Sequence, residues 1–361
     1  MKKWITSIGI LFLCLFIGGC REPKSEAADN NEAFERFQAE FIGVFDVKVQ
    51  IIGFAETEEE FLEKSQVIFD KMHELHKLYD IYNDYEGVAN IKTINDNAGI
   101  APVKVDRQII DLILLSKEAY EKTDGLTNIA MGSVLRIWHR FRTSANDFPE
   151  DAELPKEENL RAAALHMNID DVIVDEENST VFLADPDMRL DVGAVAKGFA
   201  AEIAKDAAVA AGFESGILDA GGNVLTIGAP RDGRERWGIG IQDPAKEADG
   251  VRNILDTVYV NNMSVVTSGR YHRFFEVDGK IYNHIIDPRT LFPADLYAAV
   301  TVLHENSGVA EYLSTAIFIV SYEEGLALAK ENNAEALWIY PDGEMEATEG
   351  YRAVSKLFGD E

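Results

Sequence analysis

Apolar residues in the first part of the chain recur at helical spacing. Phe61, Ile68, Met72 and Leu75 follow one another at intervals of seven, four and three positions. This spacing places them on one face of a helix and predicts that the face is buried. The same kind of pattern predicts helices over residues 57–79, 106–122 and 130–138.

Runs of β-branched and aromatic residues bounded by turn residues predict the strands. The first predicted strand covers residues 40–53, and strands dominate from residue 172 onward. They are predicted over residues 172–174, 180–183, 188–192, 216–219, 224–227 and 238–241, with a hairpin region from residue 257 and a last strand over 336–340. Further helices are predicted over residues 194–211, 309–320 and 322–332, and residues 148–155 are predicted to form a loop.

The order of these elements decides the fold class. Strands and helices are mixed without the regular alternation of a doubly wound parallel sheet. We therefore expect an α+β fold with mixed, mostly antiparallel sheets and flanking helices. No long internal linker divides the chain. Residues 39–361 are thus expected to form one catalytic unit, and its length permits two closely packed subdomains.

The N-terminus is typical of a bacterial lipoprotein signal. Lys2 and Lys3 precede an apolar run over residues 4–17 that is short for a bilayer span. The run ends in small residues before Cys20, and a polar stretch follows. We expect residues 1–19 to be removed as a signal peptide, Cys20 to carry lipid, and residues 20–38 to form a flexible tether. An uncleaved anchor and an ordinary secretory signal are the alternatives.

Lipidation of Cys20 would hold the protein at the outer face of the cell membrane, because two or more acyl chains give stable anchoring. Cys14 would be lost with the signal, and Cys20 would be the single cysteine of the mature chain. A disulfide framework and a cysteine-based metal site are therefore excluded.

Charge excludes a further class of partner. The chain has 34 Lys and Arg against 63 Asp and Glu, a net charge of −29, which becomes −31 without Lys2 and Lys3. Such a protein is repelled by nucleic-acid phosphates, so we expect no nucleic-acid partner. A phosphate ligand would need a metal ion, backbone N–H groups or a few well-placed basic side chains. Solubility at an exposed surface explains most of the acidity.

Residues 264–293 hold the densest group of reactive side chains. An apolar strand is predicted to end in a hydroxyl-rich turn at Thr267 and Ser268, and a hairpin follows. The return strand would bring His284 and Asp287 beside a proline. This combination indicates an anion site with a group that can transfer a proton. The alternative role of His284 is a hydrogen bond that holds the hairpin.

A second motif joins a predicted strand to a predicted helix. Asp191 ends the strand, Gly193 permits a sharp turn, and Lys197 lies in the first turn of the helix. Helix N-termini present free N–H groups that suit phosphates. A plain strand-to-helix turn with a surface lysine is the alternative.

A carboxylate and a hydroxyl share the face of a later predicted helix. Glu311 and Thr315 are four residues apart and therefore lie side by side on that helix. Both are hard oxygen ligands of the kind that Mg²⁺ takes together with phosphate oxygens. The alternative is a first-turn glutamate with a buried threonine.

Two segments would line a pocket, and a third turn stays ambiguous. Residues 124–132 include Leu126, Thr127 and Asn128, and Tyr82 follows the first long helix. An aromatic ring at Tyr82 could stack on a planar ligand, although core packing is commoner. The paired glycines after Asp219 permit close approach of a ligand or form only a tight turn. No metal-ligand spacing is found among His73, His76, His139, His166, His272 and His304.

Together these segments resemble the ApbE family of FAD:protein FMN transferases. The resemblance covers about residues 40–345, and its motifs follow one another in the family's order. They are Gly-x-x-Asn/Asp-x-Ala-x-Gly at 125–132, Asp-x-Gly-x-x-Ala-Lys-Gly at 191–198, Gly-Gly-Asn at 221–223, Trp-x-Ile-Gly-Ile-x-Asp-Pro at 237–244, Thr-Ser-Gly at 267–269, His-Ile-Ile-Asp-Pro-Arg-Thr at 284–290 and Leu-Ser-Thr-Ala at 313–316.

The resemblance implies a reaction and a site. FMN would pass from FAD to a Thr or Ser hydroxyl of an acceptor protein, with Mg²⁺ present and AMP released. The implied magnesium ligands are Ala194, through its carbonyl, Glu311 and Thr315. The expected FAD-binding residues are Phe45, Tyr82, Leu126, Thr127, Asn128, Asp191, Lys197 and Ile286, together with Thr267 and Ser268 in the segment over residues 264–293. His284 and then Asp287 are the candidates for proton transfer, and the expected acceptor is a flavoprotein of surface or membrane electron transport.

Two positions depart from the family's pattern. Glu311 stands where the family usually has aspartate, and Leu291 stands where it usually has glycine. The longer arm of Glu311 would shift a bound ion, but neither change removes a needed chemical group. Two other functions stay open: an FAD pyrophosphatase that yields FMN and AMP, and a non-catalytic flavin-binding lipoprotein.

Overall fold

The computed structural model describes residues 34–245, 253–271 and 273–359. The predicted signal peptide, Cys20, most of the predicted tether and His272 lie outside these residues. None of the helices in the described ranges has the length and apolar character needed to span a membrane.

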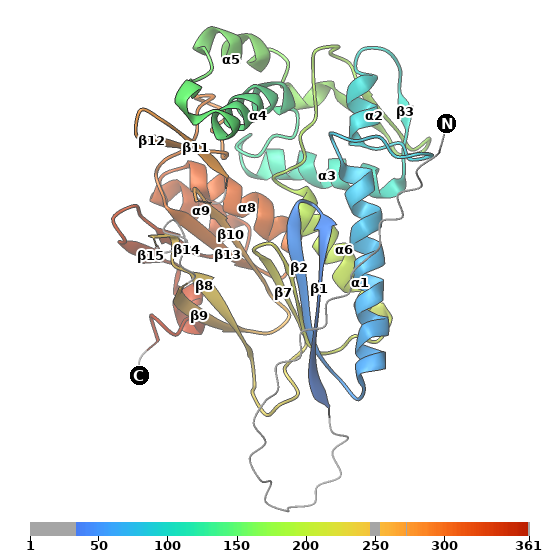
Figure 1. Cartoon of the computed structure of the whole chain (residues 1–361), viewed down its shortest axis with the longest axis vertical. Coiled ribbons are helices and arrows are strands. Elements are labelled where there is room, and N and C mark those ends of the chain that lie inside the picture. The colour runs from blue at the N-terminus through green and yellow to red at the C-terminus, as the bar shows by residue number, and fades with distance from the viewer. Residues whose placement is uncertain (1–33, 246–252, 272, 360–361) are drawn as a thin grey trace, which may run out of the picture.

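Nine α-helices lie in the described part of the chain (Figure 1). They are α1 Glu58–Tyr79, α2 Ile91–Asp96, α3 Arg107–Lys122, α4 Gly132–Asp147, α5 Glu157–Ala164, α6 Ala196–Ala210, α8 Ser307–Ile319, α9 Tyr322–Glu331 and α10 Glu349–Val354. The longest, α1, is capped by Thr57, whose side chain accepts a hydrogen bond from the backbone N–H of Glu60.

An eight-stranded sheet forms the centre, in the order β1-β2-β6-β7-β10-β13-β14-β15, with every neighbouring pair antiparallel. Its strands are β1 Glu35–Val44, β2 Val47–Ala55, β6 Gly216–Ala220, β7 Asn223–Ile227, β10 Ser264–Gly269, β13 Ala299–His304, β14 Glu335–Ile339 and β15 Met345–Ala347. The smaller sheets pair β3 Val103–Lys104, β5 Thr180–Leu183 and β4 Val172–Asp175, then β8 Trp237–Gln242 with β9 Ile254–Val260, and β11 Phe274–Val277 with β12 Lys280–Asn283.

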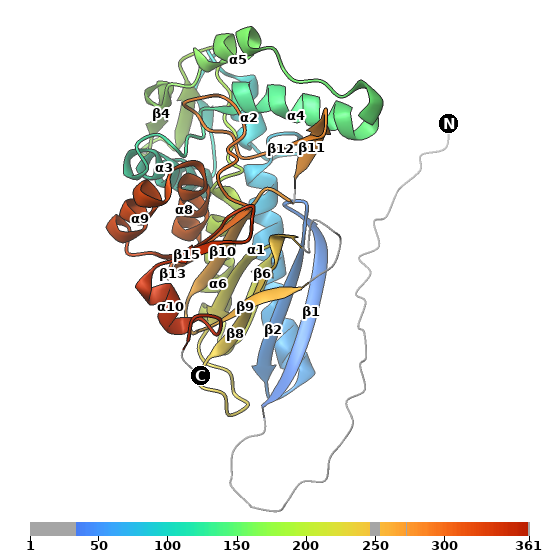
Figure 2. The same cartoon turned by 90° about the vertical axis from the view of Figure 1, so that its left-hand side faces the viewer.

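Both faces of the large sheet are covered. Helices α1, α6 and α8 pack on one face, and the β8–β9 ribbon and α10 lie against the other (Figure 2). In β10, Val266 joins the core under the helices, whereas Val265 packs in the cluster that contains Trp237. A strand that is buried on both faces has no polar side, which explains why this region reads as a continuous apolar run.

A second part sits above the sheet in Figure 1 and is built from α2 to α5, the small β3-β5-β4 sheet and the β11–β12 hairpin. It has an apolar cluster of its own around Trp138, whose Nε1 donates to the carbonyl of Leu291 at 2.9 Å. The predicted α+β class with antiparallel sheets and flanking helices is therefore confirmed.

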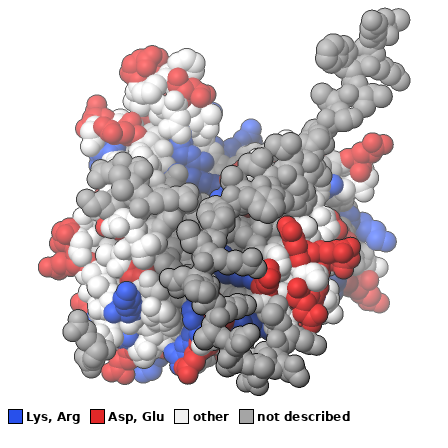
Figure 3. Space-filling view, turned by 60° about the horizontal axis from the view of Figure 1, so that its bottom comes forward, with Lys and Arg blue, Asp and Glu red and all other residues white. Residues whose placement is uncertain are grey.

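The charge on the surface agrees with the excess of acidic residues in the composition. On the face shown in Figure 3, Asp and Glu form several separate patches, and Lys and Arg are scattered between them. Most basic side chains that reach an acid do so across short distances on the surface, for example Lys92 with Asp96 at 2.6 Å. Exposed pairs of this kind contribute little to stability.

The predicted boundaries were wrong at the start of the domain. Residues 40–53 form two strands, because the chain reverses at Phe45 and Asp46, whose φ angles are 51° and 55°. β1 begins at Glu35, so the tether predicted to reach residue 38 ends earlier. The strand was missed because β1 is an edge strand with exposed polar residues at its start.

Residues 188–192 are not the predicted strand. Only Arg189 forms a bridge, with Met131. The backbone of Leu190 is instead paired by a side chain, since Asn95 donates to its carbonyl at 3.0 Å and accepts from its N–H at 2.6 Å. A side-chain amide can satisfy an extended backbone in place of a neighbouring strand.

Other elements differ in detail. Thr267 and Ser268 lie inside β10 and not in a turn after it. The predicted loop over residues 148–155 includes the 3₁₀ turn Pro149–Asp151. The pattern missed α2, α5, β13, β15 and α10, and the strand predicted as the last is followed by two of these.

Candidate active site

The site is built where α6 begins. Asp191 Oδ1 accepts a hydrogen bond from the N–H of Gly193 at 3.0 Å, which holds the turn before the helix. Lys197 and Gly198 are the second and third residues of α6. Their N–H groups have no partner inside the helix, so the helix start is a site for an anion.

The carboxylate of Glu311 on α8 lies at this helix start. Its Oε2 accepts from the N–H of Gly198 at 2.5 Å, and its Oε1 lies 2.8 Å from Lys197 Nζ. Glu311 is only 5% exposed. A buried carboxylate needs such compensation, and here a backbone donor, a helix N-terminus and an ammonium group supply it.

The close contact depends on a glycine. A Cβ at Gly198 would lie 2.5 Å from the carbonyl oxygen of Ser307 and 2.9 Å from Glu311 Cβ. Both neighbours belong to α8, so a larger residue at this position would push the two helices apart.

The other two predicted metal ligands belong to the same two segments as Glu311 and the start of α6. Thr315 lies one turn further along α8 and is half-buried, and its hydroxyl makes no hydrogen bond to any residue that the structure describes. Ala194 lies in the turn before α6. A carboxylate, a hydroxyl and a carbonyl are hard donors, and each carboxylate oxygen keeps a second lone pair beside Lys197. The donor set therefore fits a magnesium ion.

Strand β10 supplies one hydroxyl to this centre. Ser268 Oγ lies 2.8 Å from Ser314 Oγ, and Ser314 Oγ donates to the carbonyl of Glu311 at 2.9 Å. Thr267 instead pairs with Thr301 Oγ1 at 2.8 Å. Successive strand residues point to opposite faces, so Ser268 faces α8 and Thr267 points away from it.

Asp219 belongs to this neighbourhood and was missing from the predicted site residues. It is the last residue but one of β6, and its Oδ1 accepts from the N–H of Gly222 at 3.0 Å. Burial raises the pKa of Asp219 above its usual value, and the nearby Lys197 opposes that rise. The paired glycines, with φ of 62° at Gly221 and 92° at Gly222, were the sequence signal for the tight turn.

The segment over residues 126–128 is fastened to the same helix. Leu126 is buried, and Thr127 Oγ1 donates to the carbonyl of Tyr312 in α8 at 3.2 Å. Asn128 points elsewhere, because its Nδ2 donates to the carbonyl of Met167 at 2.9 Å. The predicted pocket wall is therefore in contact with α8 through Thr127.

Tyr82 is exposed and pairs with a histidine that sequence reasoning set aside. Its Oη lies 2.8 Å from His139 Nδ1, and the two rings are 6.3 Å apart. Burial lowers the pKa of His139, which favours the neutral imidazole, and a neutral imidazole can accept a hydrogen bond from the phenol hydroxyl. Asp191 interacts electrostatically with both residues, which places this pair near the turn before α6.

The residues that follow β12 contact the apolar side of α4 through Ile286 and Leu291. Asp287 is buried, and its two oxygens lie 3.0 and 2.8 Å from Nε and Nη2 of Arg289. Within the described ranges no hydrogen bond or ion pair joins Asp287 to Glu311. His284 follows β12 directly and is half-buried, and Ile286 packs in the cluster around Trp138.

Phe45 is placed by the β1–β2 turn. Its N–H donates to His76 Nδ1 at 3.2 Å, and its ring lies 5.5 Å from the His76 ring. His76 of α1 thus helps to hold the β1–β2 turn.

Leu291 explains one departure from the family's pattern. Its φ is 66°, a left-handed conformation that favours glycine. The side chain is buried in the cluster around Trp138. Leucine is tolerated because this packing offsets a backbone cost of roughly 1–2 kcal/mol.

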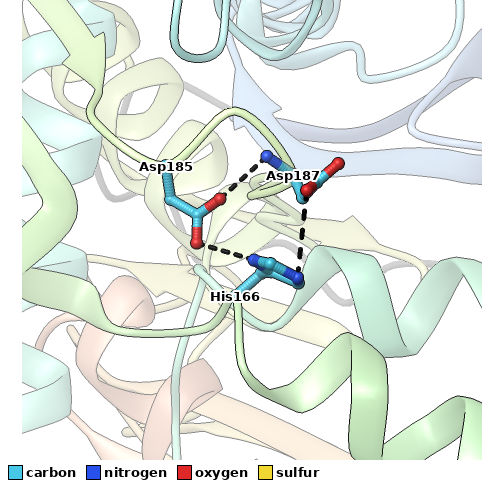
Figure 4. Close-up of side chains that lie close together, drawn as sticks. All are labelled: His166, Asp185 and Asp187. Atoms are coloured by element: carbon cyan, nitrogen blue, oxygen red, sulfur yellow. Dashed lines mark hydrogen bonds and ion pairs between the residues drawn. The ribbon is translucent and has the colours of Figure 1, made fainter.

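A separate cluster joins His166, Asp185 and Asp187 (Figure 4). His166 Nδ1 lies 2.7 Å from Asp185 Oδ2, and Asp185 Oδ1 accepts from the N–H of Asp187 at 2.8 Å. Those two bonds already account for the arrangement, which closes the loop after β5. We assign it a structural role.

The fold and the α6–α8 centre define an α+β protein in which a buried carboxylate lies at a helix start, close to a lysine. Residues 45–338 match the model of the ApbE family, and the chain belongs to that family. The FAD:protein FMN transferase of Treponema pallidum (strain Nichols) is 36% identical over 270 residues, which cover 72% of this chain and 73% of the relative. The FAD:protein FMN transferase of Klebsiella pneumoniae (strain 342) is 33% identical over 253 residues, with 70% and 75% covered.

Solved structures agree. The crystal structure of the ApbE protein of Thermotoga maritima superimposes with a TM-score of 0.77 at 27% identity, covering 91% of this chain and all of that chain. The flavin transferase ApbE of Vibrio cholerae, at 21% identity and a TM-score of 0.71 over 89% of this chain, shares the fold.

Proposed function

We propose that this protein transfers FMN from FAD to a Thr or Ser hydroxyl of an acceptor protein and releases AMP. The observation that carries the proposal is the buried Glu311 carboxylate held by Lys197 and Gly198 at the start of α6, with Thr315 one turn further along α8. This is a site for a cation and a phosphate in a chain that otherwise repels phosphate. The names of the two relatives at 33% and 36% identity support the same reaction.

Magnesium would be held by the carbonyl of Ala194, the carboxylate of Glu311 and the hydroxyl of Thr315. When bound, it would neutralise charge that develops on the pyrophosphate. Lys197 supplies a second positive charge, and its ion pair with Glu311 keeps the ammonium at the helix start. Asp219 lies in electrostatic contact with Lys197 and helps to fix its position.

The flavin would lie along Asp191, Leu126 and Thr127, and Asn128 stays a predicted contact whose side chain bonds to the carbonyl of Met167. Tyr82 is exposed enough to stack on the ring system, and its hydrogen bond to His139 fixes its orientation. Ser268 contributes a hydroxyl to the centre through Ser314, whereas Thr267, Phe45 and Ile286 remain predicted contacts.

In the reaction, the acceptor oxygen bonds to the phosphorus on the FMN side, and the bond from that phosphorus to the oxygen of AMP breaks. The hydroxyl proton must pass to a base as the oxygen attacks. We favour His284 for this proton, because both oxygens of Asp287 are held by the guanidinium of Arg289. Asp287 would then stabilise the turn that follows His284.

The test uses the purified full chain with FAD, Mg²⁺ and candidate acceptor proteins, and intact-mass spectrometry follows the acceptor. The expected result is a gain of one FMN group on the acceptor with AMP released in equal amount, both lost when EDTA is added. Free FMN and AMP at a rate that no acceptor increases would instead identify an FAD pyrophosphatase. FAD that stays intact would identify a flavin-binding lipoprotein.

We also propose that lipid on Cys20 anchors the protein to the outer face of the membrane, where the acceptor is a flavoprotein of surface or membrane electron transport. The charged N-terminus, the short apolar run and the small residues before Cys20 support this location. The Cys20→Ser variant is expected to leave the membrane fraction. If it stays with the membrane as wild type does, the anchor proposal fails.

A further inference from the structure

The outer face of α4 is basic in a strongly acidic protein. Arg136 and Arg140 lie one turn apart and are exposed, and Thr143 continues the same side. The opposite side packs Val134 and Trp138 into an apolar cluster. The helix therefore presents its arginines outward because its apolar side is fixed against the cluster.

These side chains line an open groove beside the candidate flavin site. Its wall includes three arginines, two exposed aromatic rings and one acidic residue, namely Arg136, Arg140, Arg142, Tyr82, Phe148 and Asp147. Tyr82 and Phe148 are 60% and 57% exposed. Tyr82 joins the groove to the candidate active site, because Asp191 acts electrostatically on it.

Among the described residues, the arginines of the groove have no acidic partner within ion-pair distance. In residues 34–245, 253–271 and 273–359, no ion pair within 4.0 Å involves Arg136, Arg140 or Arg142, whereas Arg107 and Arg289 are both paired. Burial and the nearby guanidinium of Arg273 lower the pKa of Arg142. Three positively charged side chains thus line one groove in a chain that has 63 Asp and Glu but only 34 Lys and Arg.

We propose that this groove, formed by the outer face of α4 and Tyr82, binds an acidic segment of the acceptor protein and presents a nearby hydroxyl to the candidate active site. The inference rests on the proposed transfer of FMN. Charge complementarity supports it, because unpaired arginines gain most from carboxylates, and the net charge elsewhere repels an acidic partner. The aromatic rings at Tyr82 and Phe148 add apolar contact area at the two ends.

A binding experiment that does not depend on transfer tests the groove. The probe is a fluorescein-labelled peptide with one Thr flanked by Asp and Glu, compared with the same peptide carrying Asn and Gln. Fluorescence anisotropy with the full-length protein is expected to show about tenfold tighter binding of the acidic peptide, and this preference should fade in high salt.

The test variant is the double substitution Arg136→Glu with Arg140→Glu, and the milder pair Arg136→Gln with Arg140→Gln serves if charge reversal impairs folding. Either is expected to weaken binding of the acidic peptide about tenfold or more, since two charge contacts are lost. The matched control is Arg36→Glu, because Arg36 lies on the edge strand β1, is exposed and makes no ion pair to any described residue.

Three results would overturn the inference. They are equal binding of the acidic and neutral peptides, unchanged affinity in both double variants, and loss of FAD affinity in those variants, which would assign the arginines to the nucleotide. Failure of the proposed function would give a different result from failure of the docking surface. A protein that binds the acidic peptide through these arginines but transfers no FMN to any acceptor keeps the docking surface and loses the activity.

Discussion

Glu311 is the residue on which the candidate chemistry depends, since its carboxylate meets both the start of α6 and Lys197. We expect Glu311→Gln to slow FMN transfer about 10²–10³-fold, because an electrostatic stabiliser of the reacting phosphates is lost. Glu311→Asp restores the residue type usual in the family and is expected to keep transfer but change the Mg²⁺ concentration that gives half the maximal rate. The measurement is the rate of acceptor modification against Mg²⁺ concentration.

Glu305→Gln is the matched control for this pair. Glu305 is exposed, precedes α8 and forms no ion pair within the part of the chain described. If Glu311→Gln kept the rate and Mg²⁺ dependence of Glu305→Gln, Glu311 would not hold the metal ion.

His139 predicts a pH dependence of stability. Burial lowers its pKa below the usual 6.5, Asp191 opposes the shift, and Arg142 and Arg273 add to it. Because the unfolded chain takes up this proton at higher pH than the folded chain, the contribution of His139 to stability is complete above about pH 6.5 and is lost as the pH falls. The melting temperature is expected to fall between about pH 7 and 5.

His139→Gln should make that fall smaller, because glutamine does not titrate. Burial also lowers the pKa of His73. His73→Gln should therefore remove a separate part of the fall in melting temperature at low pH. A melting profile of His139→Gln that parallels wild type at every pH would contradict the assignment to His139.

At the scale of elements, the α6–α8 contact positions the candidate site. Gly198→Ala would bring a Cβ within 2.5 Å of the Ser307 carbonyl oxygen, and backbone atoms cannot rotate away. We expect this variant to lose about 1–3 kcal/mol of unfolding free energy and to lose transfer activity as well, because Glu311 moves with α8. Urea denaturation and the transfer assay measure the two effects.

Gly193→Ala is the control for the helix contact. A Cβ there would meet only Asp191 Oδ1, at 3.1 Å, and Gly193 is exposed. Its unfolding free energy should change much less. Equal losses in both variants would mean that the α6–α8 spacing is not the cause.

At the scale of the whole molecule, a buried carboxylate ties the C-terminal segment to the β8–β9 ribbon. Asp256 is 3% exposed and accepts hydrogen bonds from Tyr351 Oη at 3.0 Å, Ser355 Oγ at 2.6 Å and the N–H of Leu357 at 2.9 Å. Asp256→Ala leaves these donors without an acceptor, so we expect a loss of roughly 2–4 kcal/mol. Denaturation and limited proteolysis of the C-terminal segment provide the measurement.

Asp170→Ala gives the comparison for this carboxylate. Asp170 is exposed, and its side chain accepts no hydrogen bond from any described residue. If the two variants unfolded at the same denaturant concentration, Asp256 would not anchor the C-terminal segment.

Long amphipathic helices were predictable because their signal is local. The core face of α1 could be assigned from Phe61, Ile68 and Leu75, all of which are buried in the structure. Short or edge elements were not, since α2 and β1 depend on neighbours that the sequence does not place side by side. Residues 188–192 show the same limit, because the partner of Leu190 is the side chain of Asn95, a residue 95 positions away.

The sequence by itself determined the fold class, the family and most residue types of the candidate site. Helix periodicity and the motifs around Lys197 and Glu311 depend only on residues that are close together in the chain. Only the tertiary structure decided which of these side chains meet. It joined Glu311 to the start of α6, turned Thr267 away from Ser268 and paired Tyr82 with His139. It also gathered the arginines of α4 around a groove. Such contacts depend on the packing of distant elements, and local sequence does not encode their distance or direction.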